Sequence, residues 1–86
     1  MRYILHPNLK KIYKKLSRKL LAKIDERLDL FRDDEFNFLL ENHPLHGEYE
    51  GYRSINITGD YRALYFIKDN IAIFVKLGTH SELFGK

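Results

Sequence analysis

The chain has 86 residues and no cysteine, so we expect a single domain over residues 1–86 without disulfides, thiolate metal sites or a cysteine nucleophile. Its 44% hydrophobic content is typical of a folded domain, but no apolar stretch is long enough for a signal peptide or a membrane span, and we therefore expect a soluble, cytoplasmic protein. The net charge of +3 hides an asymmetry: residues 1–27 carry nine basic and two acidic side chains, and residues 28–86 carry six and ten.

A short strand and a helical region are predicted for the first third of the chain. Residues 2–6 form an apolar run that ends at Pro7, which is typical of a strand followed by a helix start. From Leu9 to Phe31 the apolar residues recur every three or four positions, as they do in an amphipathic helix. Ser17 is a favourable N-cap residue, so the pattern fits either one long helix or two antiparallel helices. We favour the helical hairpin, with its break near position 17.

The rest of the chain is predicted to form an apolar plug, a loop and three strands. Residues 36–40 are expected to close the bottom of the core before the loop 42–47, and alternating residues 52–57 indicate a half-buried strand. Strands over 61–68 and 71–77 are joined by Asp69-Asn70, a two-residue turn that tolerates positive φ. We predict an α+β fold of order β-α-α-β-β-β, in which the helical hairpin packs on a twisted antiparallel sheet of about four strands.

Basic side chains dominate the predicted helical region, where no acid precedes Asp25. They recur at four-residue steps and would form one continuous flank beside the apolar stripe. Like charges at this spacing repel by roughly 0.2–0.5 kcal/mol per pair, so we interpret the flank as a surface for nucleic acid or the ribosome, with a merely soluble surface as the alternative. A membrane-surface role fits less well because the apolar stripe is explained as core. The residues are Lys10, Lys11, Lys14, Lys15, Arg18, Lys19 and Lys23.

Histidines are the main candidates for chemistry. His43 and His46 lie in a loop that contains proline and glycine, and His80 follows the last predicted strand. We expect no metal or other cofactor, because the sequence contains no set of ligands at characteristic metal-binding spacing. Imidazole groups exchange protons near neutral pH, which suits cleavage of RNA by its own 2′-hydroxyl. In that reaction a base takes the hydroxyl proton, cations neutralise the phosphate and an acid protonates the departing 5′ oxygen.

The place of such a site in the sheet is left open by the strand directions. Asp60 precedes the strand 61–68, and His80 follows the strand 71–77. If both strands are antiparallel over their full length, we expect Asp60 and the residues after Leu77 at opposite ends. A site on the sheet face, reached by loops and tails, is then as consistent as a site at one end. Asp60 is equally consistent with a plain turn residue.

Residues 43–85 resemble the carboxyl half of the RelE/ParE superfamily of bacterial toxins, and within it the YafQ-like members. The matching blocks are HPLHG at 43–47, GYR at 51–53, GDY at 59–61 and GTHSELF at 78–84. The resemblance implies the toxin of a type II toxin-antitoxin system. Such a toxin is an endoribonuclease (mRNA interferase) that enters the ribosomal A site, cleaves mRNA and is held inactive by a cognate antitoxin. It also implies the family fold, a helical hairpin against a twisted antiparallel sheet.

The same resemblance assigns candidate catalytic residues by matching motif. His43 and His80 correspond to active-site histidines, which would serve as acid and base in either order. Asp60 corresponds to an active-site aspartate. Phe84 corresponds to a terminal aromatic that would stack on a nucleobase, with packing of the tail on the core as the alternative. Arg62 resembles an arginine of RelE that could stabilise charge in the transition state.

Two positions depart from the family pattern, and a third has two interpretations. Asn56 stands where YafQ-like toxins have a histidine, so only a hydrogen-bonding role toward RNA remains there. Lys76 stands where relatives often have arginine, and a lysine neutralises phosphate without binding it bidentately. Arg53 of the GYR block either contacts RNA or is structural.

Two other functions stay open at this point. A ParE-like inhibitor of DNA gyrase would share the fold but lack the nuclease residues, and the presence of His43, Asp60 and His80 argues against it. A catalytically silent RNA-binding or antitoxin-binding relic is the other alternative. For either toxin we expect an acidic, partly disordered antitoxin that wraps the basic helices and covers the sheet face.

Overall fold

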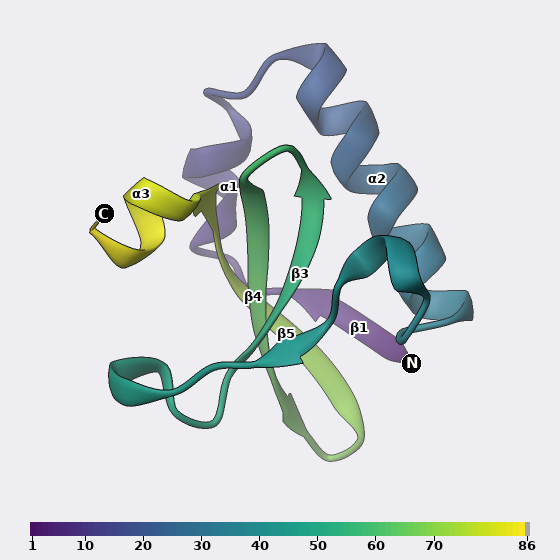
Figure 1. Ribbon diagram of the computed structural model, residues 1–86. Coiled ribbons are helices and arrows are strands. Elements are labelled where there is room, and N and C mark those ends of the chain that lie inside the picture. The colour runs from purple at the N-terminus through teal and green to yellow at the C-terminus, as the bar shows by residue number, and fades with distance from the viewer. Residues whose placement is uncertain (86) are drawn as a thin grey trace.

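The fold is a sheet with α1 and α2 packed on one face and the short helix α3 at the end of the last strand (Figure 1), and the computed structural model describes residues 1–85. The predicted α+β class and the order of the main elements are confirmed. The elements are β1 (Arg2–Leu5), α1 (Leu9–Tyr13), α2 (Arg18–Asp33), the 3₁₀ turn η1 (Phe38–Leu40), β2 (His43–Pro44), the 3₁₀ turn η2 (Gly47–Tyr49), β3 (Arg53–Thr58), β4 (Tyr61–Lys68), β5 (Ile71–Thr79) and α3 (His80–Phe84).

The break between the first two helices depends on Ser17. Its side chain accepts a hydrogen bond from the Leu20 N–H at 3.1 Å and so caps α2. Helices α1 and α2 run in opposite directions (Figure 1), so the predicted helical hairpin is confirmed. The predicted continuous flank of cations is wrong, because the step from Lys14 to Arg18 crosses this break.

The sheet is mixed, with the strand order β1-β5-β4-β3-β2. Strands β3, β4 and β5 form the predicted antiparallel meander, and Asp69 and Asn70 take φ values of 53° and 63° in the turn. The prediction of a fully antiparallel sheet of about four strands needs two corrections. Strand β1 pairs in parallel with β5, because the helical hairpin lies between β1 and the meander, and the two-residue β2 adds a fifth strand among the described residues.

The core lies between α2 and the inner face of the sheet. Ile24, Leu28 and Phe31 recur at three- or four-residue steps on α2, and all three are buried. The ring centroid of Phe31 lies 5.1 Å from that of Tyr65 on β4 and 5.2 Å from that of Phe74 on β5, edge to face in both cases. Such aromatic pairs stabilise by about 0.5–1.5 kcal/mol beyond their buried area. This cluster fixes the helical layer on the sheet.

The predicted apolar plug at residues 36–40 is largely wrong. Leu40 is fully buried, but Phe36 and Phe38 are 64% and 82% exposed, and Leu39 is exposed as well. A single 3₁₀ turn directs successive side chains about a third of a turn apart, so only one of its residues reaches the core. Among residues 1–85, no helix is long and apolar enough to cross a membrane.

Candidate active site

A cleft of about 400 Å³ opens where the segment around β2, strand β4 and helix α3 meet. Four of the predicted catalytic residues lie in it together, although they are up to 41 positions apart in the chain. They bring two imidazoles, one guanidinium and one aromatic ring to the same space. The cleft is lined by Glu41, His43, Leu45, His46, Arg62, His80 and Phe84.

The backbone around β2 orients His43. Its Nδ1 lies 2.7 Å from the carbonyl oxygen of Glu41. A carbonyl oxygen only accepts hydrogen bonds, so Nδ1 carries the proton in this contact and donates it. In the neutral ring Nε2 is then the nitrogen with a free lone pair. This geometry suits His43 to take a proton from a substrate.

Asn42 anchors the segment that carries His43. Its Nδ2 donates to the carbonyl oxygen of Glu35 at 2.9 Å and to the Tyr65 hydroxyl at 2.8 Å, while its Oδ1 accepts from Arg53 Nε at 3.0 Å. Burial raises the pKa of the Tyr65 phenol, and the hydrogen bond with Asn42 lowers it in part. The Arg53 guanidinium also lies 5.5 Å from the centroid of the Phe36 ring. These contacts are internal and favour the structural interpretation of Arg53.

His80 and Phe84 are placed by the short helix α3. Thr79 and Glu82 form a capping box at its start: the Thr79 hydroxyl accepts from the Glu82 N–H at 3.1 Å, and the Glu82 carboxylate accepts from the Thr79 N–H at 2.8 Å. His80 and Phe84 are one helical turn apart, with ring centroids separated by 4.9 Å. Helix α3 therefore presents an imidazole and an aromatic ring side by side in the cleft.

Asp60 lies beside His80 through the backbone. The His80 N–H donates to the Asp60 carbonyl oxygen at 3.0 Å, and the first residue of β4, Tyr61, is paired with Thr79 of β5. The expectation that Asp60 and the residues after Leu77 lie at opposite ends is wrong, because one strand of an antiparallel pair begins where its partner ends. The Asp60 side chain is exposed and is not part of the cleft lining.

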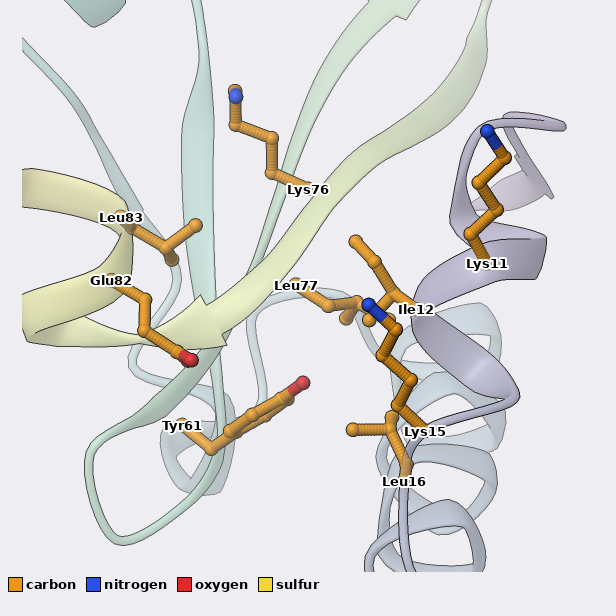
Figure 2. A pocket seen from close by; sticks show the side chains of 9 residues that line it. All are labelled: Lys11, Ile12, Lys15, Leu16, Tyr61, Lys76, Leu77, Glu82 and Leu83. Carbon is orange, nitrogen blue, oxygen red and sulfur yellow. The ribbon is translucent and has the colours of Figure 1, made fainter.

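Lys76 lies outside the cleft, in a second groove of about 420 Å³. Figure 2 shows Lys11 on α1 and Lys15 in the turn that follows this helix, on the opposite side of the groove from Lys76 on β5. Burial raises the pKa of the Tyr61 phenol in the groove, and the negative charge of Glu82 raises it further. We call this site the lysine groove; it is lined by Lys11, Ile12, Lys15, Leu16, Tyr61, Lys76, Leu77, Glu82 and Leu83.

The other predicted RNA-binding cations are distributed over separate surfaces. Lys10 and Lys14 line a depression beside Leu5 and Pro7. Lys19 and Lys23 line another, next to Thr58, and Lys23 Nζ is also 2.9 Å from a carboxylate oxygen of Glu26. Arg18 is exposed at the first position of α2. The cations thus surround the helical layer instead of following one line.

Two side chains near the cleft, Glu41 and His46, received no site role from the sequence. Glu41 accepts a hydrogen bond from Asn56 Nδ2 at 3.1 Å, which fixes the residue that replaces the family histidine. His46 lines the cleft, with Nδ1 3.8 Å from a carboxylate oxygen of Glu50. The position of His46 three residues after His43 is the signal that could have included it. Among residues 1–85, no three His, Asp or Glu side chains are arranged to hold a metal ion.

Known proteins share this fold and part of this sequence. The mRNA interferase toxin YafQ of Escherichia coli strain K12 is 38% identical over 45 residues, which are 52% of this chain and 49% of that protein. The chain thus matches about half the length of this curated relative. The crystal structure of the E. coli DinJ-YafQ toxin-antitoxin complex has a TM-score of 0.76 at 24% identity, over 96% of both chains. YafQ from E. coli strain BL21(DE3) has a TM-score of 0.74 at 22% identity, over 99% of this chain and 100% of that one.

A family model gives the assignment over nearly the whole chain. Residues 3–85 match the family described as the bacterial toxin of type II toxin-antitoxin system, YafQ. The match includes the half that carries the four motif blocks. It also includes the basic helical half, whose sequence resembles the family only in layout and charge. The chain therefore belongs to the YafQ family of bacterial toxins of type II toxin-antitoxin systems.

Proposed function

We propose that this chain is a ribosome-dependent endoribonuclease, the toxin of a type II toxin-antitoxin system, which cleaves mRNA in the cytoplasm and so inhibits translation. The observation that carries the proposal is the cleft, in which His43, Arg62, His80 and Phe84 converge. The family and the name of the E. coli relative, an mRNA interferase toxin, support it.

In the proposed mechanism His43 is the general base. Its Nδ1 is engaged with the Glu41 carbonyl oxygen, so Nε2 takes the proton of the RNA 2′-hydroxyl. The 2′ oxygen then attacks the adjacent phosphorus, and the bond from phosphorus to the 5′ oxygen breaks. His80, protonated, gives its proton to the departing 5′ oxygen. The products are a 2′,3′-cyclic phosphate and a 5′-hydroxyl.

The other residues of the cleft assist this reaction. The Arg62 guanidinium offsets the charge that builds on the phosphate oxygens in the transition state. Phe84 stacks on a nucleobase next to the scissile phosphate, where it also supports the His80 ring. Asp60 positions His80 through its backbone carbonyl, and Lys76 contacts the RNA backbone outside the cleft. Asn56 takes part through its hydrogen bond to Glu41.

We also propose that an acidic, partly disordered antitoxin inhibits the chain. One similar solved structure is that of the E. coli DinJ-YafQ toxin-antitoxin complex. In this chain the lysine groove offers three cations beside apolar side chains, a lining that suits a segment with carboxylates and apolar residues. The remaining cations of α1 and α2 would contact ribosomal RNA.

The proposal is tested by inducing wild-type protein and the variants His43→Ala, His80→Ala and His6→Gln in bacteria. We expect growth arrest and mRNA cleavage from wild type and from His6→Gln, whose imidazole accepts a hydrogen bond from the Asn8 N–H outside the cleft. We expect neither effect from the two cleft variants, provided that they keep the wild-type circular dichroism. Intact mRNA with wild type would refute the proposal, and inhibition of DNA gyrase in a supercoiling assay would replace it with the alternative.

A further inference from the structure

The two walls of the cleft come from segments that are far apart in the chain. One wall, residues 41–46, continues directly into the turn η2, and the other is the helix α3. The last residue of η2, Tyr49, makes the one side-chain hydrogen bond that joins the two segments within residues 1–85. Its hydroxyl donates to the carbonyl oxygen of Leu83 at 3.1 Å, across 34 positions of sequence.

Helix α3 needs a contact of this kind. It has five residues, and an isolated helix of that length does not form in water. Its capping box orders the start, but the last carbonyl groups of a helix have no partner within the helix itself. The Tyr49 hydroxyl supplies a partner for the carbonyl oxygen of Leu83, next to Phe84.

Tyr49 also belongs to a chain of aromatic rings that ends at His80. Its ring centroid is 5.6 Å from that of Phe84 and 6.0 Å from that of Tyr52, with edge-to-face geometry in both pairs. Tyr52 in turn packs on Phe66 of β4 with a centroid distance of 5.6 Å. Phe84 lies against His80 at 4.9 Å. The rings therefore connect the sheet to the histidine through Tyr49.

Two glycines set the direction of the Tyr49 side chain. Gly47 and Gly51 flank it with φ values of 70° and 92°, a region that disfavours residues with a side chain. The backbone thereby turns twice within five residues and returns Tyr49 toward α3. The sequence HGEYEG at 46–51 thus builds a loop with one inward-directed aromatic residue.

We propose that Tyr49 is a positioning residue for the cleft, which holds α3 so that His80 and Phe84 face His43. It acts through Phe84 and through the carbonyl of Leu83, and it does not touch the reacting atoms. Its catalytic consequence rests on the proposed function, whereas its effect on α3 does not. Loss of one hydrogen bond of this kind raises the population of undocked α3 roughly two- to tenfold, and loss of the ring raises it further.

The experiment compares Tyr49→Phe and Tyr49→Ala with Tyr52→Phe, the matched control, because the described contacts of Tyr52 are made by its ring. The first readout is NMR of the purified protein. It measures the ring-current shift that Phe84 imposes on the His80 imidazole, and the hydrogen exchange of the Gly85 amide, which donates to the Ser81 carbonyl oxygen at 2.8 Å. The second readout is the single-turnover rate of mRNA cleavage on programmed ribosomes.

We expect Gly85 exchange to rise roughly two- to tenfold in Tyr49→Phe and further in Tyr49→Ala, with the His80 shift reduced in the same order. Amides of the core strands and the Tyr52→Phe variant should keep wild-type values. The cleavage rate should fall in the same order, while the KM for ribosomes changes little. Wild-type NMR behaviour in Tyr49→Ala would overturn the proposal. Altered α3 without any cleavage by the wild-type protein would leave the positioning role supported and refute the proposed function instead.

Discussion

Replacement of Asn42 by alanine should destabilise the protein far more than a typical polar substitution. The side chain makes hydrogen bonds with the Glu35 carbonyl oxygen, the Tyr65 hydroxyl and Arg53 Nε, at 2.9, 2.8 and 3.0 Å. At about 1 kcal/mol net for each bond, Asn42→Ala should cost about 2–4 kcal/mol. In a domain of this size each kcal/mol lowers the Tm by roughly 4–8 °C, so the expected decrease is about 8–32 °C.

Thermal and urea unfolding followed by circular dichroism measures this effect. Asn8→Ala is the matched control, because Asn8 is exposed and its side chain makes no capping hydrogen bond to α1. A double-mutant cycle with Tyr65→Phe should give a coupling of about 1 kcal/mol for the Asn42–Tyr65 bond. If the Tm of Asn42→Ala stays within a few degrees of that of Asn8→Ala, the network does not anchor the segment that carries His43, and the reasoning is refuted.

Three further predictions concern other parts of the molecule. Burial raises the pKa of Tyr13 to about 12, so the fold favours the neutral phenol and loses stability as the pH rises from 10 through 12. Solvent screening at this half-buried side chain limits the loss to about 1 kcal/mol at pH 11. Tyr13→Phe should remove it in urea titrations at pH 8 and pH 11, and an unchanged pH dependence would contradict this. Phe38→Ser should change stability by less than about 0.5 kcal/mol because Phe38 is exposed, whereas Leu40→Ala should cost about 2–5 kcal/mol because Leu40 is fully buried. Equal costs would show that the turn η1 is packed differently. The double variant Lys11→Glu and Lys15→Glu should bind an acidic antitoxin more weakly and with a smaller salt dependence, as measured by calorimetry at two salt concentrations. Lys68→Glu is the control and should leave binding unchanged. Unchanged binding by the double variant would show that the lysine groove is not part of the interface.

Local sequence patterns predicted the elements whose causes are local. The Ser17 cap, the spacing of the buried residues on α2 and the Asp69-Asn70 turn each depend on a few neighbouring residues, and all three are present as predicted. The parallel pairing of β1 with β5 depends on contacts across the whole chain, and no short pattern encodes it. The same holds for the exposure of Phe38, since an apolar residue in a short turn carries no signal of its direction.

The candidate site was predicted as a set of residues and not as a geometry. Motif resemblance identified His43, Arg62, His80 and Phe84, and the structure places these four in one cleft. It does not place Lys76 there, because the last strand directs that side chain to the lysine groove. Periodicity did not reveal the contact of Tyr49 with α3, since a hydrogen bond between residues 34 positions apart depends on the fold.

The chemical ends of the cleaved RNA test the central claim most directly. Attack by the 2′-hydroxyl, with His43 as base and His80 as acid, leaves a 2′,3′-cyclic phosphate and a 5′-hydroxyl. We predict that mRNA cleaved on translating ribosomes by wild-type protein carries these ends, as shown by mass spectrometry and by labelling with polynucleotide kinase without prior dephosphorylation. His43→Ala and His80→Ala should produce no such fragments. Fragments with a 5′-phosphate and a 3′-hydroxyl, or unchanged cleavage by both variants, would contradict the proposed mechanism.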